Sequence, residues 1–353
     1  MNASTRARVV RLVLLVILLV GCTAPTLDAP LAGTDGEAGA DRSGPEGAAS
    51  EPMRVVATTS ILGDIVRSIA GDHADVEVVI PAGVDPHGFE PSAAVGVAMR
   101  EADLVVANGL QLEDGLESII AAAAADGATV FTLADKLDPI PFDGGEHDDD
   151  GADDDHDAED DHDEHDHGPL DPHVWFDPVR MTQGAELLAA ALADADTVRD
   201  GAAWSADGEA YAAKLRALHD ELEATFGSIP RQRRVLVTNH DSLGYLAARY
   251  DLTVLGTVVP GASTHVAPDA RAFAALIEQV AAADVRVIFV ERTDAADGPE
   301  QLAREVTDRT GRQVEVVALD TDALTPPGTA ADTYLGLLET TANTIAEALG
   351  AVG

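Results

Sequence analysis

Residues 76–92 read VEVVIPAGVDPHGFEPS, a short β-branched run followed by a turn and a histidine. The run Val76–Ile80 is typical of a buried strand, and Pro81 with Gly83 favours a rigid turn over a helix. His87 therefore lies seven residues beyond a predicted strand. Ligands of open parallel sheets bind outside the carboxyl ends of the strands, which makes His87 a candidate binding residue.

Seven other runs of this kind alternate with Ala-rich stretches of helical length. Those in the first half are 54–58, 103–107 and 129–133, and those in the second are 234–238, 253–258, 286–290 and 314–319. Alternating strands and helices favour parallel sheets with both faces covered. We therefore predict an α/β fold of two similar parallel-sheet (βα)4 lobes.

A helical stretch separates the two sets of strands. Residues 178–229 contain no strand signal, and apolar residues recur at helical spacing at Tyr211, Leu215, Leu218, Leu222 and Phe226. We expect a long linker helix over residues 205–230. It would join an N-terminal lobe, 53–204, to a C-terminal lobe, 231–353.

The N-terminus has the pattern of an export signal. Three arginines precede the apolar run Leu12–Val20, which is too short to span a bilayer but suits a signal peptide. Its end resembles the bacterial lipoprotein signal, in which Cys22 would be lipidated. The alternative is an ordinary secretory signal that contains a cysteine.

We therefore expect residues 1–22 to be a lipoprotein signal peptide and residues 23–52 a disordered tether. The tether is rich in Ala, Gly, Pro and acidic residues, and its root-mean-square span is on the order of 30 Å. Lipidation would hold the folded part on the outer face of the bacterial cytoplasmic membrane. The alternative location of the protein is the periplasm.

Composition limits the classes of function. The 353 residues carry 63 acidic and 22 basic side chains, for a formal net charge of −41. Such a chain repels nucleic-acid backbones, so we exclude nucleic acid as a partner, whereas carboxylates and imidazoles suit cations. Hydrophobic residues make up 46%, enough for sizeable cores. With one cysteine, neither an intramolecular disulfide nor a cysteine-based zinc site can form.

A His/Asp-rich segment, 143–168, interrupts the N-terminal lobe. Residues 143–171 contain 16 acidic residues, no Lys or Arg, and five histidines, namely His147, His156, His162, His165 and His167. The segment cannot pack a core, so we predict a solvated loop. It is either an acidic spacer or a collector that binds zinc weakly at these histidines.

Three other polar residues lie close to predicted strands or helices. His173 follows Asp171-Pro172, His240 follows the strand 234–238 by two residues, and Asp332 precedes the last helix. Each has an ordinary alternative, because loop histidines are commonly solvated and Asp332 is placed like a helix N-cap. These positions favour a metal site, but the residues alone leave both the metal site and the ordinary roles open.

Several motifs together resemble one family. They are residues 56–64, 83–92, 108–113, 171–178, 240–246, 287–291 and 332–334, which read VATTSILGD, GVDPHGFEPS, NGLQLE, DPHVWFDP, HDSLGYL, VIFVE and DTY. They resemble, in one register over 54–350, the zinc/manganese (ZnuA/TroA-like) substrate-binding proteins of ATP-binding cassette (ABC) importers. The resemblance implies two lobes bridged by a helix, with a metal in the cleft between them.

The resemblance also implies four metal ligands: His87, His173, His240 and Asp332. Manganese-type relatives have a carboxylate as the third ligand, whereas three imidazoles and one carboxylate suit tetrahedral Zn²⁺ better than Mn²⁺. Four protein ligands leave no open position for an activated water, so we expect a carrier and not an enzyme. Glu90, Glu113 and Glu291, which lie within the motifs, are expected to orient the site or to bind backbone.

The implied function is capture of Zn²⁺ and its delivery to an ABC permease. A metallochaperone is a second candidate partner, and we expect a monomer. The alternatives are a manganese- or iron-binding receptor of the same family, a surface adhesin, and a secreted zinc enzyme. No His-Glu-x-x-His motif supports the enzyme. Since imidazoles bind metal only when neutral, affinity should fall below a pH of about 6.5.

Overall fold

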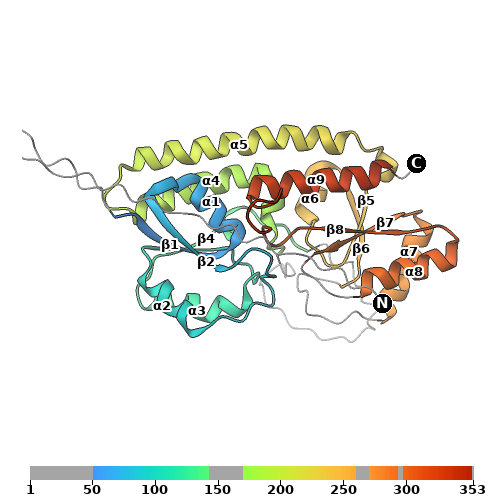
Figure 1. Cartoon of the computed structure of the whole chain (residues 1–353), viewed down its shortest axis with the longest axis horizontal. Helices are drawn as coiled ribbons and strands as arrows, with labels where there is room; N and C mark the ends of the chain where they lie inside the picture. Colours follow the sequence, from blue (N-terminus) through green and yellow to red (C-terminus); the bar gives the residue numbers. More distant parts are fainter. Residues whose placement is uncertain (1–50, 143–169, 260–269, 293–296, 352–353) are drawn as a thin grey trace, which may run out of the picture. The chain divides into compact units, whose positions relative to one another are not determined.

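The computed structural model describes residues 51–142, 170–259, 270–292 and 297–351. The predicted signal peptide, Cys22 and nearly all of the predicted tether lie outside these residues, as do the five loop histidines. We describe the compact unit Ser50–Gly353, which contains two parallel sheets with helices (Figure 1). None of its described helices is both long and apolar enough to cross a membrane.

The N-terminal sheet has the strand order β2-β1-β3-β4, with every neighbouring pair parallel. Its strands are β1 (Met53–Thr59), β2 (Ala74–Ile80), β3 (Leu104–Ala107) and β4 (Val130–Thr132). The helices that connect them are α1 (Ser60–Ala70), α2 (Ala93–Glu101) and α3 (Asp114–Ala125). Successive side chains of β1 point to opposite faces, so Val55 and Ala57 enter one core and Val56 another, with residues of α2 and α3.

The C-terminal sheet repeats this topology in the order β6-β5-β7-β8, again all parallel. Its strands are β5 (Val235–Thr238), β6 (Thr253–Thr257), β7 (Val287–Glu291) and β8 (Glu315–Leu319). Its helices are α6 (Gly244–Tyr250), α7 (Ala270–Ala282), α8 (Gly298–Thr310) and α9 (Tyr334–Ala351). The prediction of an α/β fold with two four-strand parallel sheets is confirmed.

Two long helices connect the sheets. Helix α4 (Pro178–Ala195) begins after Asp177, whose side chain accepts hydrogen bonds from two backbone N–H groups. Helix α5 spans Gly201–Gly227, so it begins earlier than residue 205. The reason is Asp200, whose side chain accepts from the N–H of Ala202 and caps the helix there.

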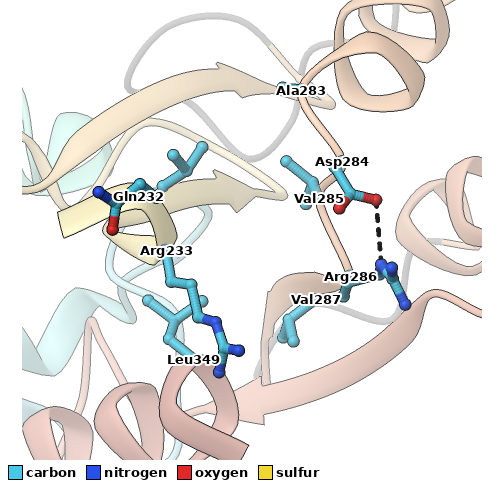
Figure 2. A pocket seen from close by; sticks show the side chains of 9 residues that line it. Gln232, Arg233, Ala283, Asp284, Val285, Arg286, Val287 and Leu349 are labelled. Carbon is cyan, nitrogen blue, oxygen red and sulfur yellow. Dashed lines mark hydrogen bonds and ion pairs between the residues drawn. The ribbon is translucent and has the colours of Figure 1, made fainter. Parts of the chain in front are cut away.

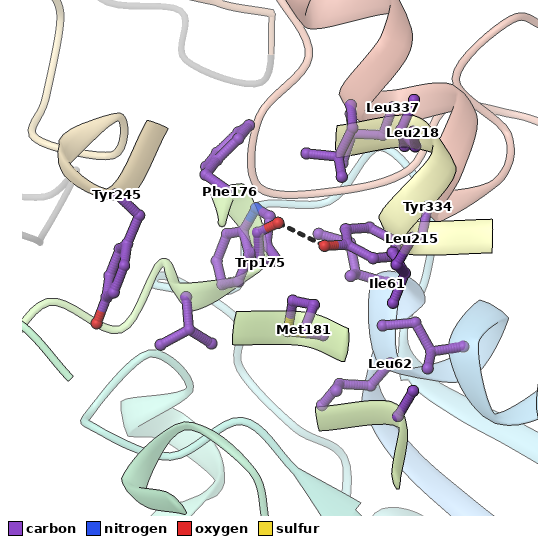
Figure 3. Close-up of a cluster of buried hydrophobic side chains, with 14 of the residues drawn as sticks. Ile61, Leu62, Trp175, Phe176, Met181, Leu215, Leu218, Tyr245, Tyr334 and Leu337 are labelled. Atoms are coloured by element: carbon purple, nitrogen blue, oxygen red, sulfur yellow. Dashed lines mark hydrogen bonds between the residues drawn. The ribbon is translucent and has the colours of Figure 1, made fainter. Parts of the chain in front are cut away.

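The longest of the described helices, α5, packs against parts of both halves of the unit. It contacts α1 in the first half and α6 and α9 in the second, in addition to α4 (Figure 1). Its buried residues include all five of the predicted stripe. They belong to one core cluster that also contains Ile61 of α1 and Leu337 of α9 (Figure 3). A shared core fixes the two sheets relative to one another more firmly than a flexible linker would.

A hydrogen bond between two buried aromatic residues also joins the halves. The hydroxyl of Tyr334, at the start of α9, donates to the carbonyl of Trp175 (Figure 3). The indole N–H of Trp175 in turn donates to the carbonyl of Thr321, at 3.1 Å. Trp175 therefore holds the chain on both sides of the β8–α9 connection.

We predict that Gly208→Ala destabilises the metal-free protein, because helices α4 and α5 approach closely at this glycine. A Cβ atom there would lie 2.5 Å from Ala189 Cβ and 3.3 Å from the carbonyl oxygen of Ala185. Such overpacking costs about 1–3 kcal/mol, more than the roughly 1 kcal/mol that alanine gains in helix propensity. The measurement is the melting temperature without metal.

Gly227→Ala is the matched control, because its Cβ would meet no atom within 4 Å. It should leave the melting temperature unchanged or raise it slightly. Equal melting temperatures for the two variants would contradict close packing of α4 on α5.

Candidate metal centre

Four buried side chains from distant parts of the sequence meet between the two halves of the unit. They are His87, His173, His240 and Asp322, and one potential ligand atom of each lies within 4.8 Å of all the others. Their side chains are at most 3% exposed. The structure thus brings together the three predicted histidines, with an aspartate that the sequence analysis did not select.

The topology explains this meeting. His240 comes two residues after β5 and Asp322 three residues after β8, while His87 lies in the connection between β2 and α2. His173 immediately precedes the short 3₁₀ turn Val174–Phe176 that leads into α4. Two of the four residues therefore come from each half, and an ion bound to all four would link the halves.

The distances between the four side chains fit a single bound ion. The Nε2 atoms of His87 and His173 are 3.3 Å apart. The Asp322 oxygens lie 3.7, 3.9 and 3.4 Å from the Nε2 atoms of His87, His173 and His240, respectively. Tetrahedral ligands about 2.0 Å from Zn²⁺ are roughly 3.3 Å apart. Most of these separations are too long for hydrogen bonds.

Several of these polar atoms also have no partner within the described chain. Neither oxygen of Asp322 and neither ring nitrogen of His240 makes a hydrogen bond to any described residue. Burying such groups unpaired is costly. A cation coordinated by Asp322 and by the Nε2 atoms would compensate most of this cost.

A carboxylate lies next to each histidine of the cluster. Asp171 Oδ1 accepts from the backbone N–H of His173 at 2.9 Å and lies 2.7 Å from its Nδ1. Asp85 likewise accepts from the backbone N–H of His87 at 2.9 Å. The Nδ1 of His240 lies 3.3 Å from Oε2 of Glu291. In His173 and His240, a carboxylate next to Nδ1 leaves Nε2 to face the cluster.

The electrostatics of the cluster suit a cation. Burial lowers the pKa of His240 to about 3, against the opposing charge of Asp322, so this imidazole is neutral and able to coordinate. Burial alone would raise the pKa of Asp322, but the three histidines outweigh it and hold that pKa well below its usual value. Asp322 therefore supplies a negative charge at neutral pH.

Two other pKa shifts come from the surrounding carboxylates. Burial would lower the pKa of His173, but Asp171, through its charge and its hydrogen bond, and Asp322 together raise it. Burial, and then the charge of Asp322, raise the pKa of Glu291 well above its usual value. The buried carboxylates of Glu291 and Asp322 thus lie close together, and a cation beside them would favour ionisation of both.

Hydrogen bonds to the opposite half of the unit hold the segment that carries Asp322. The backbone N–H of Leu324 donates to the Ser60 hydroxyl at 3.0 Å, and its carbonyl accepts from the N–H of Gly83 at 2.8 Å. With the bond from Trp175 to Thr321, contacts on both sides of residue 322 turn its carboxylate toward the histidines.

The assignment of Asp332 is corrected. Its Oδ2 accepts from the backbone N–H of Gly328 at 2.6 Å, within the turn before α9, and it does not join the cluster. The family resemblance at residues 332–334 implies Asp332, while the place of this residue next to the last helix suits an ordinary helix cap. The rule that points to His240, a polar residue just beyond a strand, would also have selected Asp322, which follows β8.

A pocket of about 300 Å³ lies elsewhere and contains no predicted site residue. It is lined by Gln232, Arg233, Val235, Arg286 and Val287, among others (Figure 2). Val235 and Val287 are the first residues of β5 and β7. The pocket therefore lies at the amino ends of these strands, whereas His240 follows the carboxyl end of β5.

The profile of the family described as "Zinc-uptake complex component A periplasmic" matches residues 55–348. The chain belongs to this family. As a member, it is a metal-binding, substrate-binding protein of an ABC importer and not an enzyme, and the family delivers metal to an ABC permease.

Known relatives differ in the metals that their names specify. The chain is 25% identical to the manganese-binding lipoprotein MntA of Halalkalibacterium halodurans, over 85% of this chain and 89% of that protein. It is 27% identical to the iron-binding protein YfeA of Yersinia pestis, over 85% and 88%. The structure of the periplasmic zinc-binding protein TroA from Treponema pallidum superposes with a TM-score of 0.72 at 25% identity, covering 84% and 99%.

We predict that Asp322→Asn weakens metal binding strongly and that Asp332→Asn does not. The first variant replaces a charged ligand. Its loss of metal affinity should therefore exceed the roughly 10–100-fold loss that is typical when a residue that hydrogen-bonds a metal ligand is replaced. In the second variant, the new amide oxygen could still accept from the N–H of Gly328. The affinities of both metal-free variants are measured by competition with a chelator.

Metal-free Asp322→Asn should still unfold in one cooperative transition but at a lower melting temperature, because the lowered pKa of Asp322 means that the histidines stabilise its ionised form in the folded protein. This control separates lost binding from lost folding. Weak binding in Asp332→Asn with normal binding in Asp322→Asn would reverse the assignment of the aspartate.

Proposed function

We propose that this protein captures Zn²⁺ outside the cytoplasm and delivers it to the permease of an ABC importer. The observation that carries the proposal is the donor set, which has three imidazole nitrogens and one carboxylate in a closed, buried cluster. Four ligands of this kind match the tetrahedral coordination that Zn²⁺ adopts in sites without an open position.

The choice of metal depends mainly on His240. Mn²⁺ favours oxygen ligands and a higher coordination number, whereas imidazole suits Zn²⁺. A carboxylate at position 240 would give two nitrogens and two carboxylates, and the resemblance associates that arrangement with manganese. Relatives named for manganese and iron make a manganese- or iron-binding receptor the second candidate.

We further propose that lipidated Cys22 anchors the protein through the tether 23–52 and so keeps the metal site near the outer face of the cytoplasmic membrane. Several relatives are named as lipoproteins, among them SsaB of Streptococcus sanguinis, and this supports the proposal. The signal over residues 1–22 supplies the sequence argument. Tethering keeps the carrier close to its permease.

The loop 143–168 is proposed to collect zinc loosely and to speed its capture. Its carboxylates and imidazoles are ligands for cations, and His167 is only six residues from His173. In this proposal the loop changes the rate of capture, while the buried cluster sets the final affinity. A metallochaperone that gives zinc to the loop is a candidate partner.

We predict one tight zinc site, with weaker Mn²⁺ and Fe²⁺ binding, when the metal-free domain is titrated against a competing chelator. His240→Ala should lose most zinc affinity. His240→Glu should lose zinc affinity but gain Mn²⁺ affinity relative to Zn²⁺, because it replaces a nitrogen ligand with oxygen. Tight Mn²⁺ or Fe²⁺ binding with weak Zn²⁺ binding would support the second candidate.

Deletion of residues 144–167 is the control for the loop. The deleted protein should retain one tight zinc site and bind zinc more slowly in stopped-flow measurements. Disappearance of the tight site with the loop would show that the buried cluster does not set the affinity.

A further inference from the structure

Glu291 is a fully buried carboxylate that lies behind the metal cluster without belonging to it. It is the last residue of β7 and is 3% exposed. In the sheet, β7 lies between β5 and β8. Its carboxyl end is therefore flanked by the two segments that carry His240 and Asp322.

The two carboxylate oxygens of Glu291 contact different partners. Oε1 accepts from the hydroxyl of Ser242 at 3.2 Å and from the hydroxyl of Thr321, the residue before Asp322. Oε2 lies 3.3 Å from Nδ1 of His240, and neither of these two buried atoms makes a hydrogen bond to any described residue. One side chain thus contacts both segments of the C-terminal half that contribute to the site.

We propose that Glu291 is the positioning residue for the C-terminal half of the site: in the metal-bound protein it accepts a hydrogen bond from the Nδ1–H of His240, which leaves the Nε2 lone pair for the metal. Its other oxygen holds Thr321, and so the adjacent Asp322, in register with His240. The inference rests on the proposed function, because it assumes that the cluster binds a metal.

The chemistry of imidazole explains why this contact matters. A neutral imidazole has one N–H and one lone pair, and the partner of one nitrogen determines which nitrogen can coordinate. A carboxylate behind a ligating histidine also raises the basicity of the ligand, and loss of such partners typically costs about 10–100-fold in metal affinity. His173 has the corresponding partner in Asp171.

The other half of the protein offers a matched control in Glu113. This carboxylate is also 3% exposed, and it accepts from the Thr58 hydroxyl at 2.8 Å and from the backbone N–H groups of Asn108 and Gly109 at 2.7 and 3.2 Å. None of these contacts involves a residue of the metal cluster. Glu→Gln at the two positions therefore makes the same chemical change with and without a contact to the cluster.

The test compares Glu291→Gln with Glu113→Gln. For Glu291→Gln we expect zinc affinity to fall about 10–100-fold, while the metal-free melting temperature stays the same or rises because one of two adjacent buried carboxylates is neutralised. Glu113→Gln should lower the melting temperature and leave zinc affinity unchanged. Normal zinc affinity in Glu291→Gln would overturn the proposal.

Histidine nitrogen NMR of the zinc-loaded protein gives a readout that a purely structural role would not change. The original protein should show a slowly exchanging, deshielded Nδ1–H resonance that His240→Ala removes, and Glu291→Gln should shift it upfield and speed its exchange. Absence of this resonance from the original protein would overturn the proposal even if Glu291→Gln did not fold.

The two proposals fail in different ways. If the original protein binds no zinc, manganese or iron, the proposed function fails before any variant is compared. If it binds metal normally and Glu291→Gln does so equally well, only the role of Glu291 is wrong.

Discussion

The site depends on a positive charge that can pair with the buried carboxylate of Asp322. It lies among three imidazoles, and neither of its oxygens accepts a hydrogen bond from a described residue. In the protein interior, an unpaired negative charge is costly and a paired one is strongly held. A divalent cation at the centre supplies the pairing that the polypeptide does not. The cluster therefore suits a bound cation, which agrees with a carrier that must bind its metal and release it again.

A site shared by two halves requires the halves to keep their spacing. Helix α5 and the core it shares with α1 and α9 provide this constraint, as do the hydrogen bonds that join Leu324 to Ser60 and Gly83. Because interiors are close-packed, small relative shifts of the halves would change the distances between ligands. A small displacement of one pair of candidate ligands relative to the other would therefore disrupt the geometry of the cluster.

The sequence was enough to predict the fold, since each strand is a short β-branched run between helical stretches and the alternation implies parallel pairing. His87, His173 and His240 were candidates because they follow strands or turn motifs, and the family resemblance then implied them as ligands. Asp322 was missed, although it lies three residues after β8, because the resemblance at residues 332–334 implied Asp332. Which of the two aspartates turns inward depends on tertiary hydrogen bonds with Ser60, Gly83 and Trp175, and local sequence does not encode these bonds. Likewise, the contact between Glu291 and His240 arises from strand order in the sheet.

X-ray absorption at the zinc edge, on protein loaded with one equivalent of Zn²⁺, would reveal the ligands of the bound ion. We expect four nitrogen and oxygen ligands at about 2.0 Å, with the outer-shell scattering of three imidazoles. A six-coordinate shell, or scattering from fewer than three imidazoles, would be incompatible with a closed site formed by His87, His173, His240 and Asp322.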